Sequence, residues 1–363
     1  MSKKIVLIAA GGTGGHLFPA AAFAEEMFRR GWRVVLMTDA RGRRYAEGFP
    51  AERIEDVPAA SLSGNPFKAV PALFKIYRGI RAANQRLSDL QPALVAGFGG
   101  YPSFPALMAA RQQRIPILIH EQNAVLGRVN RAMAKNAAAV ACGFERLDRL
   151  PPEAASRKHV TGNPVRLPIL AARERPYAEP PAGGRIHLLV IGGSQGARLF
   201  GEVIPAAVAL LPAELRARLD VAQQVREEQL KSAQKAYEKT GVRAEVATFF
   251  SDVGPRLAAA HLVIARAGAS SVTELQAAGR PAILIPFAAA ADDHQTANAE
   301  GLTSVGAADL FTEADFTPAS LAATLERRFA DPHGLAVRAA AARAAGKPDA
   351  ARSLADLAEQ VAL

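Results

Sequence analysis

The residue best placed for acid–base chemistry is His16, which directly follows the glycine-rich turn Gly11–Gly15. This turn lies between a short apolar run, Ile5–Ala9, and a stretch of helical sequence. Glycines at such a turn let backbone N–H groups approach an anion, and the start of the helix adds positive potential. An imidazole beside a phosphate site can act as a general base on a hydroxyl, although a histidine here can equally cap or pack the helix.

A second group of polar residues occupies two helix starts in the other half of the chain. The segment Arg266–Glu274 supplies small residues, hydroxyls and helix N–H groups that suit a diphosphate, and Glu274 is placed to hold the two hydroxyls of a ribose. A serine-rich helix cap is the alternative for this segment. The run Asp292–Asn298 lacks further ligands at metal spacing, so we expect its Gln and Asn to bind a sugar. We predict neither a metal nor a cofactor.

The sequences of the two glycine turns argue against two common kinds of phosphate-binding loop. A copy of the first turn, Gly192–Gly196, follows the apolar run His187–Ile191. Neither turn continues into the Gly-Lys-Ser/Thr of a Walker loop, and Leu17 and Leu199 stand where the dinucleotide fingerprint needs a third glycine. Asp39 lies at the end of the second predicted strand, where dinucleotide-binding proteins carry an acidic residue, so NAD binding stays an alternative.

These turns belong to a regular alternation of strands and helices, which predicts doubly wound α/β sheets. Several strands are apolar throughout, as expected for parallel strands covered on both faces. The second turn lies half a chain after the first, which predicts two similar domains, with a boundary near Gly162–Pro164 and a linker at Arg173–Gly184. We expect a final helix to start near Pro348 and to pack on the first domain. The predicted strands are Ile5–Ala9, Arg33–Thr38, Ala93–Gly97, Ile115–His120, Ala138–Cys142, Ile186–Ile191, Val242–Thr248, Leu262–Ala265 and Ala282–Pro286.

The composition indicates which partners and which cellular compartment to expect. The 363 residues carry a formal net charge of +10, which favours nucleic acid, phosphorylated metabolites or an acidic membrane surface. The one cysteine, Cys142, cannot form an internal disulfide, and its apolar neighbours predict a place in the core. The uncharged stretch Pro92–Ala110 is interrupted by glycines and prolines, so we predict no transmembrane segment.

The stretch Asn65–Leu87 is both amphipathic and basic. Such a helix can lie on an anionic membrane, or it can turn its apolar stripe toward a core and leave the cations in water. The apolar residues at helical spacing are Val70, Leu73, Phe74, Tyr77, Ile80 and Leu87, and the flanking cations are Lys68, Lys75, Arg78, Arg81 and Arg86.

Several short motifs, in order along residues 5 to about 311, together resemble one family. They are Gly11–His16, Gly99–Tyr101, His120–Asn123, Gly162–Arg166, Gly192–Arg198, Glu274, His294–Gln295 and Asn298. The combination is similar to the MurG family of bacterial glycosyltransferases, which complete lipid II.

The resemblance implies a GT-B architecture, in which two Rossmann-like, doubly wound parallel-sheet domains face each other across a cleft. It implies that residues 1–164 form an acceptor and membrane-facing domain, on which a helix at about 345–363 packs back. Residues 165–344 would form the domain for the UDP-sugar donor. The reaction would move N-acetylglucosamine from UDP-N-acetylglucosamine to the 4-hydroxyl of undecaprenyl-diphospho-N-acetylmuramoyl-pentapeptide (lipid I), with inversion at the anomeric carbon and release of UDP.

The resemblance also implies a set of site residues. His16 is the candidate base, and Glu121 is the competing carboxylate. No metal is implied, because helix N-termini and side chains stabilise the leaving UDP in GT-B enzymes. Many family members carry a His-Gln pair where this chain has Ala222–Arg226, so no site is assigned there. The residues implied in substrate binding are Thr13, Gly14, Gly15, Tyr101, Asn123, Arg166, Ser194, Gln195, Phe250, Ala269, Ser270, Ser271, Val272, Thr273, Glu274, His294, Gln295 and Asn298.

Such an enzyme would work peripherally at the cytoplasmic face of the bacterial inner membrane, because its acceptor is a polyprenyl lipid. The expected partners are the donor, lipid I, the anionic membrane surface near residues 65–87 and other proteins of cell-wall synthesis, but no nucleic acid. Three alternatives stay open: another GT-B enzyme acting on a glycolipid, an NAD(P)-dependent oxidoreductase, and a non-catalytic nucleotide-sugar or scaffold protein.

Overall fold

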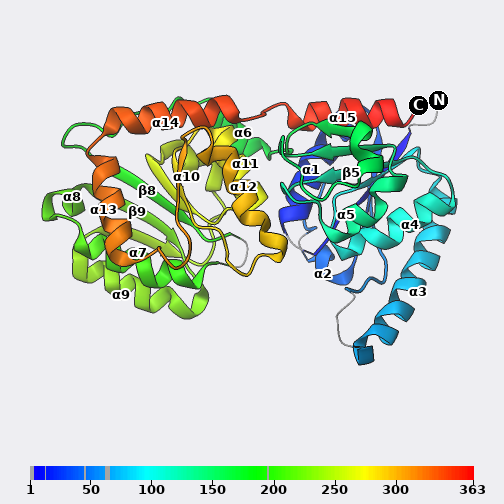
Figure 1. Ribbon diagram of the computed structural model, residues 1–363, viewed down its shortest axis with the longest axis horizontal. Coiled ribbons are helices and arrows are strands. Elements are labelled where there is room, and N and C mark those ends of the chain that lie inside the picture. Colours follow the sequence, from blue (N-terminus) through cyan, green and yellow to red (C-terminus); the bar gives the residue numbers. More distant parts are fainter. Residues whose placement is uncertain (1–3, 13, 45, 62–65, 194–195) are drawn as a thin grey trace. The chain divides into compact units, whose positions relative to one another are not determined.

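The chain folds into two compact units (Figure 1). The computed structural model describes residues 4–12, 14–44, 46–61, 66–193 and 196–363. The first unit comprises Met1–Arg166 and Lys347–Leu363, and the second comprises Leu167–Gly346. The segment 173–184, expected as a linker, lies within the second unit, where the Tyr177 hydroxyl donates to the carbonyl of His261 at 3.0 Å. No helix among the described residues is both long and apolar enough to cross a bilayer.

The first unit is built on a seven-stranded, wholly parallel sheet with the order β3-β2-β1-β4-β5-β6-β7. The chain builds one side of the sheet outward from β1 and then returns to β1 to build the other. The strands are β1 (Ile5–Ala9), β2 (Arg33–Thr38), β3 (Arg53–Asp56), β4 (Leu94–Gly97), β5 (Ile117–Glu121), β6 (Ala139–Cys142) and β7 (Lys158–Val160).

Helices cover both faces of this sheet, because side chains alternate along a strand and both sets in β1 are apolar. Val6 and Ile8 belong to the core under α1 and α15, whereas Ile5 and Leu7 belong to the core under α3, α4 and α5. The helices of this unit are α1 (Gly14–Arg29), α2 (Ala40–Arg43), α3 (Pro66–Leu90), α4 (Phe104–Gln112), α5 (Arg128–Met133) and α15 (Ala350–Val361).

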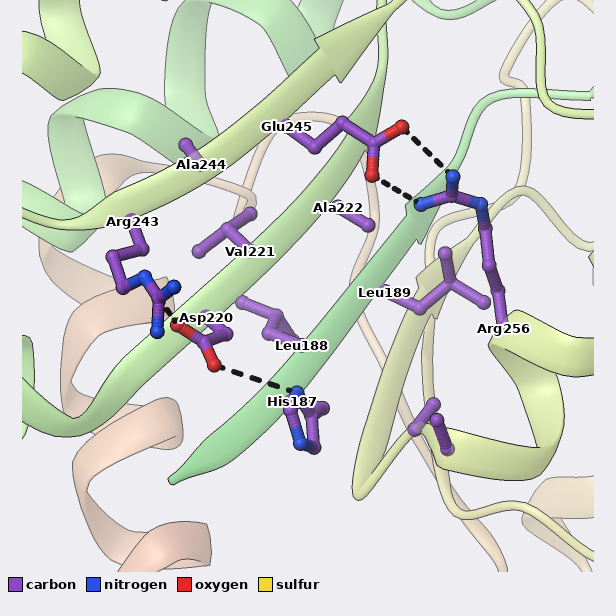
Figure 2. Close-up of a pocket in the computed structure, with 12 residues that line it drawn as sticks. His187, Leu188, Leu189, Asp220, Val221, Ala222, Arg243, Ala244, Glu245 and Arg256 are labelled. Atoms are coloured by element: carbon purple, nitrogen blue, oxygen red, sulfur yellow. Dashed lines mark hydrogen bonds and ion pairs between the residues drawn. The ribbon is translucent and has the colours of Figure 1, made fainter. Parts of the chain in front are cut away.

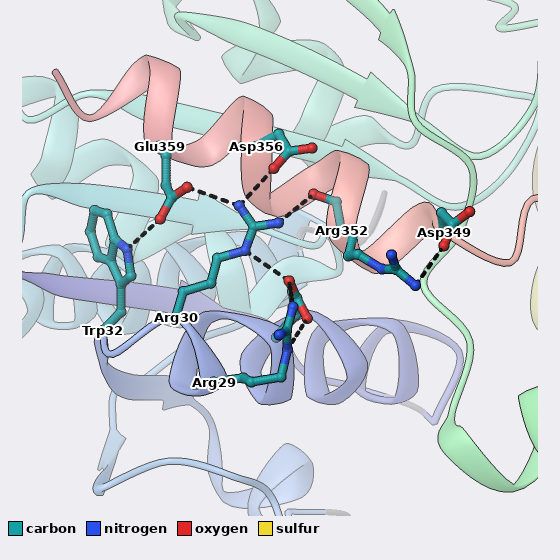
Figure 3. Close-up of polar contacts among 8 residues, drawn as sticks. Arg29, Arg30, Trp32, Asp349, Arg352, Asp356 and Glu359 are labelled. Atoms are coloured by element: carbon teal, nitrogen blue, oxygen red, sulfur yellow. Dashed lines mark hydrogen bonds and ion pairs between the residues drawn. The ribbon is translucent and has the colours of Figure 1, made fainter.

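Polar contacts fasten α15 to α1 (Figure 3). The Arg30 guanidinium contacts the carboxylates of Asp356 at 2.7 Å and Glu359 at 2.8 Å, and its Nε donates to Glu26 at 2.8 Å. The Trp32 indole N–H donates to the other oxygen of Glu359 at 3.0 Å. The last helix of the described chain is therefore part of the first unit.

α3 exposes four large apolar side chains. Val70, Leu73, Phe74 and Tyr77 are 72%, 54%, 63% and 61% exposed, whereas Leu87, near the end of the helix, is buried. The core-facing alternative from the sequence thus holds only for the last turns of α3. Large exposed apolar side chains that gather on one helix are typical of contact sites.

The second unit has a six-stranded parallel sheet with the order β10-β9-β8-β11-β12-β13. Its main core lies between the sheet and α7, α9, α13 and α14. The strands are β8 (Ile186–Ile191), β9 (Leu219–Gln224), β10 (Arg243–Ala247), β11 (Leu262–Ala265), β12 (Ala282–Leu284) and β13 (Ala308–Leu310). The helices are α6 (Leu167–Arg173), α7 (Arg198–Leu210), α8 (Ala213–Arg218), α9 (Leu230–Thr240), α10 (Val253–Ala259), α11 (Ala269–Ala278), α12 (His294–Thr303), α13 (Pro318–Phe329) and α14 (Pro332–Ala345).

Each sheet has one point where the strand order reverses. It lies between β1 and β4 in the first unit and between β8 and β11 in the second. In open parallel sheets, ligands bind beyond the carboxyl ends of the strands at this point, because the loops there diverge. The first turn opens α1 beside the loop after β4, and the segment Arg266–Glu274 opens α11 after β11.

Candidate active site

His16 lies in the first turn of α1, at the reversal point of the first sheet. Its Nδ1 is 2.9 Å from the side-chain oxygen of Gln122, which follows β5. A Cβ added to Gly99 would lie 3.5 Å from the imidazole, and one added to Gly100 would lie 3.2 Å from it. Both glycines have positive φ, +85° and +74°, a conformation that other residues rarely adopt. Glycine at both positions therefore allows the loop after β4 to lie close to the His16 ring.

Glu121 organises the loop after β5. One carboxylate oxygen accepts from the backbone and side-chain N–H groups of Asn123, at 3.0 and 3.1 Å. The other accepts from the backbone of Gly127 at 2.9 Å and from Asn130 at 2.8 Å. With four donors on a side chain that is 1% exposed, this carboxylate holds residues 121–130 in place.

Tyr101 and Asp39 are joined to each other. The Tyr101 hydroxyl donates to one oxygen of Asp39 at 2.9 Å, and the other oxygen accepts from the backbone of Gly42 at 2.9 Å and so caps α2. Burial and the Asp39 carboxylate raise the pKa of Tyr101. Asp39 is the residue for which the sequence left NAD binding as an alternative. Both of its carboxylate oxygens are already hydrogen-bonded within the first unit.

Arg166 closes the motif at the end of the first unit. Its guanidinium lies over the ring of Phe18 in α1, 4.4 Å from the ring centroid. Asn163, in the same motif, donates to the backbone carbonyl of Gln122 at 3.0 Å. The motifs Gly99–Tyr101, His120–Asn123 and Gly162–Arg166 are therefore linked to the start of α1.

In the second unit, the segment Ala269–Glu274 forms the first turns of α11, with Gly268 as the N-cap residue. No side chain caps this helix N-terminus among the residues that the structure describes. The Ser270 hydroxyl is buried and has no hydrogen-bond partner within the described ranges. A helix start without a side-chain cap presents backbone N–H groups, which suits a diphosphate.

The three predicted sugar-contacting residues of α12 differ in position. Asn298 is fully buried, and its amide donates to the carbonyl of Ala267 at 3.2 Å, so it supports the loop that leads into α11. The side-chain oxygen of Gln295 accepts from the backbone of Phe287 at 3.0 Å. His294 donates through Nδ1 to the carbonyl of Ala291 at 2.6 Å.

Phe250 is buried under the Arg256 guanidinium, whose carbon lies 4.0 Å from the ring centroid. The predicted residues Thr13, Ser194 and Gln195 lie outside the described residues. A hollow of about 360 Å³ opens beside Gly196 at the carboxyl ends of β9 and β10, with Gln224 and Thr248 in its lining.

A separate groove of about 440 Å³ lies on the face of β8, β9 and β10 (Figure 2). Its charged side chains pair with one another: Arg256 forms a two-pronged ion pair with Glu245, and Asp220 lies between Arg243 and His187. None of the predicted site residues lines this groove. It is distinct from the carboxyl ends of the strands.

Comparisons with known proteins agree with this arrangement. The family model described as glycosyltransferase family 28 N-terminal domain matches residues 6–142, and the one described as glycosyltransferase family 28 C-terminal domain matches residues 187–354. A Maricaulis maris protein named UDP-N-acetylglucosamine--N-acetylmuramyl-(pentapeptide) pyrophosphoryl-undecaprenol N-acetylglucosamine transferase is 53% identical over 98% of this chain and 97% of its own length. A Caulobacter vibrioides protein of the same name is 49% identical over 99% of both chains. The crystal structure of Acinetobacter baumannii MurG superposes with a TM-score of 0.79 at 31% identity, covering 98% of this chain and 99% of that one.

The chain belongs to the MurG family. Its two parallel α/β sheets have the GT-B fold.

Two glutamines of this MurG-family chain make contacts around the candidate site that the sequence did not indicate. Gln224 accepts from the backbone of Gly192 at 3.1 Å and donates to the carbonyls of Gly193 and Thr248 at 3.2 Å each, so it ties the second glycine turn to the end of β10. It lies in the run to which no site was assigned. Gln122 was part of a recognised motif, but its contact with His16 depends on residues 106 positions apart in the chain.

Proposed function

We propose that this MurG-family chain transfers N-acetylglucosamine from UDP-N-acetylglucosamine to the 4-hydroxyl of the muramoyl sugar of lipid I, giving lipid II. The names of its relatives describe transfer of N-acetylglucosamine from this donor to the undecaprenol-linked muramyl acceptor. The position of His16 supports this proposal at the level of residues. Its half-buried imidazole lies at the reversal point of the first sheet, and Gln122 contacts one of the two ring nitrogens.

In this mechanism Nε2 of His16 takes the proton of the acceptor 4-hydroxyl. The hydroxyl oxygen forms a bond to the anomeric carbon of the donor while the bond from that carbon to the diphosphate breaks, and UDP leaves with the electron pair. Attack opposite the leaving group inverts the anomeric configuration. We assign the base to His16 rather than Glu121, because the Glu121 carboxylate already accepts four hydrogen bonds.

We assign the donor to the second unit. The N-terminus of α11 would stabilise charge on the departing diphosphate, as preorganised N–H groups do for developing anions. Glu274, one turn into the helix, would hold the ribose. Gln295 and His294 would bind sugar hydroxyls, and Gly14, Gly15, Tyr101, Asn123 and Arg166 of the first unit would line the reacting centre.

We assign the exposed apolar side chains of α3 to the membrane surface. Val70, Leu73, Phe74 and Tyr77 would enter the interface, and the neighbouring cations Lys75, Arg78 and Arg81 would meet anionic headgroups. This contact would hold the chain peripherally at the cytoplasmic face of the inner membrane, where a polyprenyl-linked acceptor resides. Other proteins of cell-wall synthesis are expected partners there.

The deciding experiment is transfer of labelled N-acetylglucosamine from its UDP donor to a lipid I analogue, with diacylglycerol as a competing acceptor. We expect product only with the lipid I analogue. Replacing His16 by Ala should lower kcat by about 10²–10⁴-fold, the contribution of a general base. N-acetylglucosaminyl diacylglycerol as the main product would replace this proposal with the glycolipid alternative.

A further inference from the structure

An unbroken line of hydrogen bonds runs from the core of the first unit to His16. It begins at the carbonyl of Gly162, which is 3.0 Å from Nε2 of His120. Nδ1 of His120 is 3.0 Å from the side-chain nitrogen of Gln122. The side-chain oxygen of Gln122 is 2.9 Å from Nδ1 of His16.

Only one assignment of donors and acceptors fits these three contacts. A carbonyl oxygen only accepts, so Nε2 of His120 must carry its proton and donate to Gly162. Nδ1 of the neutral His120 ring is then an acceptor, so Gln122 must turn its amide N–H toward it. The same side-chain nitrogen also donates to the backbone carbonyl of His120 at 3.1 Å, which fixes the amide in the same orientation.

His120 is held neutral by its surroundings. It is 1% exposed, and its ring centroid lies 5.2 Å from that of Phe98 in the core. Burial lowers the pKa of His120 to about 4. The start of the line therefore keeps a single protonation state at neutral pH.

We propose that Gln122 is a positioning residue that fixes His16 in the tautomer with the proton on Nδ1, leaving the lone pair of Nε2 to accept the proton of the acceptor hydroxyl. The proposal rests on the assignment of His16 as the base. A ring nitrogen that faces an amide oxygen has to donate, so the opposite nitrogen has to be the accepting one.

The backbone around Gln122 is built to keep this side chain in place. Asn163 donates to the Gln122 carbonyl at 3.0 Å, and a Cβ on Gly143 would come within 2.3 Å of the Asn163 side chain. Gly143 therefore leaves the space that Asn163 occupies. Gln122 itself is 2% exposed, so water does not compete for its amide.

A glutamine suits this position better than a glutamate. A carboxylate could still accept from His16, but it would have no N–H to give to Nδ1 of His120. It would also place a negative charge in a buried site beside a neutral imidazole, which is costly unless the charge is paired. The charge would favour the protonated form of His16 and so oppose its use as a base.

The experiment combines kinetics with nitrogen NMR of the full chain labelled with ¹⁵N-histidine. Two-bond ¹H–¹⁵N correlations distinguish the two neutral tautomers from the cation, and the His16 signals are identified by their loss in His16→Ala. We expect the Nδ1–H tautomer for His16 and the Nε2–H tautomer for His120. In Gln122→Met, which keeps length but removes both polar atoms, we expect His16 to show a mixture of tautomers and kcat to fall at least about tenfold with KM within about twofold.

Gln122→Glu serves as the second variant, because it keeps the acceptor for His16. We expect it to raise the pH at which the acidic limb of kcat/KM appears. Gln113→Met removes a glutamine amide elsewhere in the same unit and should change neither readout. An Nε2–H tautomer for His16 in the unaltered chain, or a Gln122→Met variant with unchanged tautomer and kcat, would overturn the proposal. Full transfer by His16→Ala would instead overturn the assignment of the base, while leaving the NMR result intact.

Discussion

The side chain of Arg30, the residue that follows α1, contacts Asp356 on α15 at 2.7 Å, joining positions 326 residues apart in the chain (Figure 3). The same guanidinium contacts Glu26 and Glu359, and it is only 18% exposed. A cation with three acidic partners at a partly covered helix interface stabilises the fold more than an exposed pair does.

Replacing Arg30 by Met should therefore lower the free energy of unfolding of the first unit by about 1–3 kcal/mol, because Asp356 and Glu359 of α15 lose the cation that joins them to the end of α1. Urea unfolding followed by Trp32 fluorescence measures this change. Arg29→Met is the matched control, since Arg29 is 67% exposed and contacts Glu26 alone in the same cluster. Equal effects of the two variants would contradict the prediction.

Glu121→Gln should destabilise the first unit rather than remove a proton acceptor. The new N–H₂ group would face backbone or side-chain donors that now point at a carboxylate oxygen, leaving at least one of them unpaired at a cost of about 1–3 kcal/mol. We expect a lower Tm for Glu121→Gln and an unchanged Tm for His16→Ala. If Glu121→Gln kept its Tm but lost all transfer, the carboxylate would become the better candidate for the base.

Reversing the charges of Lys75, Arg78 and Arg81 to Glu should weaken binding to anionic vesicles by at least about 100-fold, because each cation near such a surface contributes about 1 kcal/mol. Sedimentation with phosphatidylglycerol vesicles measures the binding. The control reverses the exposed Lys231, Lys235 and Lys239 on α9, which changes the net charge by the same amount. Intact vesicle binding by the α3 variant would remove α3 as the contact site.

Stability should fall as the pH is lowered from about 6.5 toward 4, and part of this loss belongs to His261. Burial lowers the pKa of His261 to about 4, and its Nδ1 accepts from the backbone N–H of His187 at 2.8 Å. Between pH 6.5 and 4 the unfolded chain binds a proton at this residue while the folded chain does not, so protonation favours unfolding. The Tm of His261→Gln should depend less steeply on pH in this range than that of the unaltered chain. Parallel curves would contradict the assignment.

Gln224→Met should raise KM for UDP-N-acetylglucosamine by about tenfold, equivalent to 1.4 kcal/mol, because the turn after β8 loses its link to Thr248. Titration of the donor by calorimetry gives the same quantity without the acceptor. Gln234→Met, an exposed change on α9, is the control. An unaltered donor affinity would show that Gln224 does not support the donor site.

The central strands could be predicted from the sequence because they are apolar throughout, as β1 and β11 show. Three edge strands, β3, β7 and β13, were not predicted, whereas the edge strand β10 was. They are short and carry polar residues, as in the run Arg53–Asp56, since one side of each is left without a neighbouring strand. The inner strand β9 was also not among the predicted strands, because its only large apolar residues are Leu219 and Val221 and it carries the polar residues Asp220, Gln223 and Gln224.

The candidate site, too, has features that the sequence predicts and features that it does not. Glycine turns at strand ends follow local rules, so the positions of His16 and of the start of α11 could be predicted. The direction of the Gln122 amide could not, because Gly162 and His16 determine it from distant positions in the chain. The burial of Asn298 likewise depends on the loop before α11, which no local pattern describes.

The place of α15 in the first unit also sets the order in which the chain can fold during synthesis. The core formed by Val6, Ile8 and Phe23 stays incomplete until Leu354 and Leu357 have been made, after the whole of the second unit. At about 5–20 residues per second, the ribosome takes on the order of ten seconds or more to make that intervening unit. The second unit, whose chain is continuous, can therefore finish folding first, while the nascent first unit exposes an apolar sheet face to which chaperones can bind.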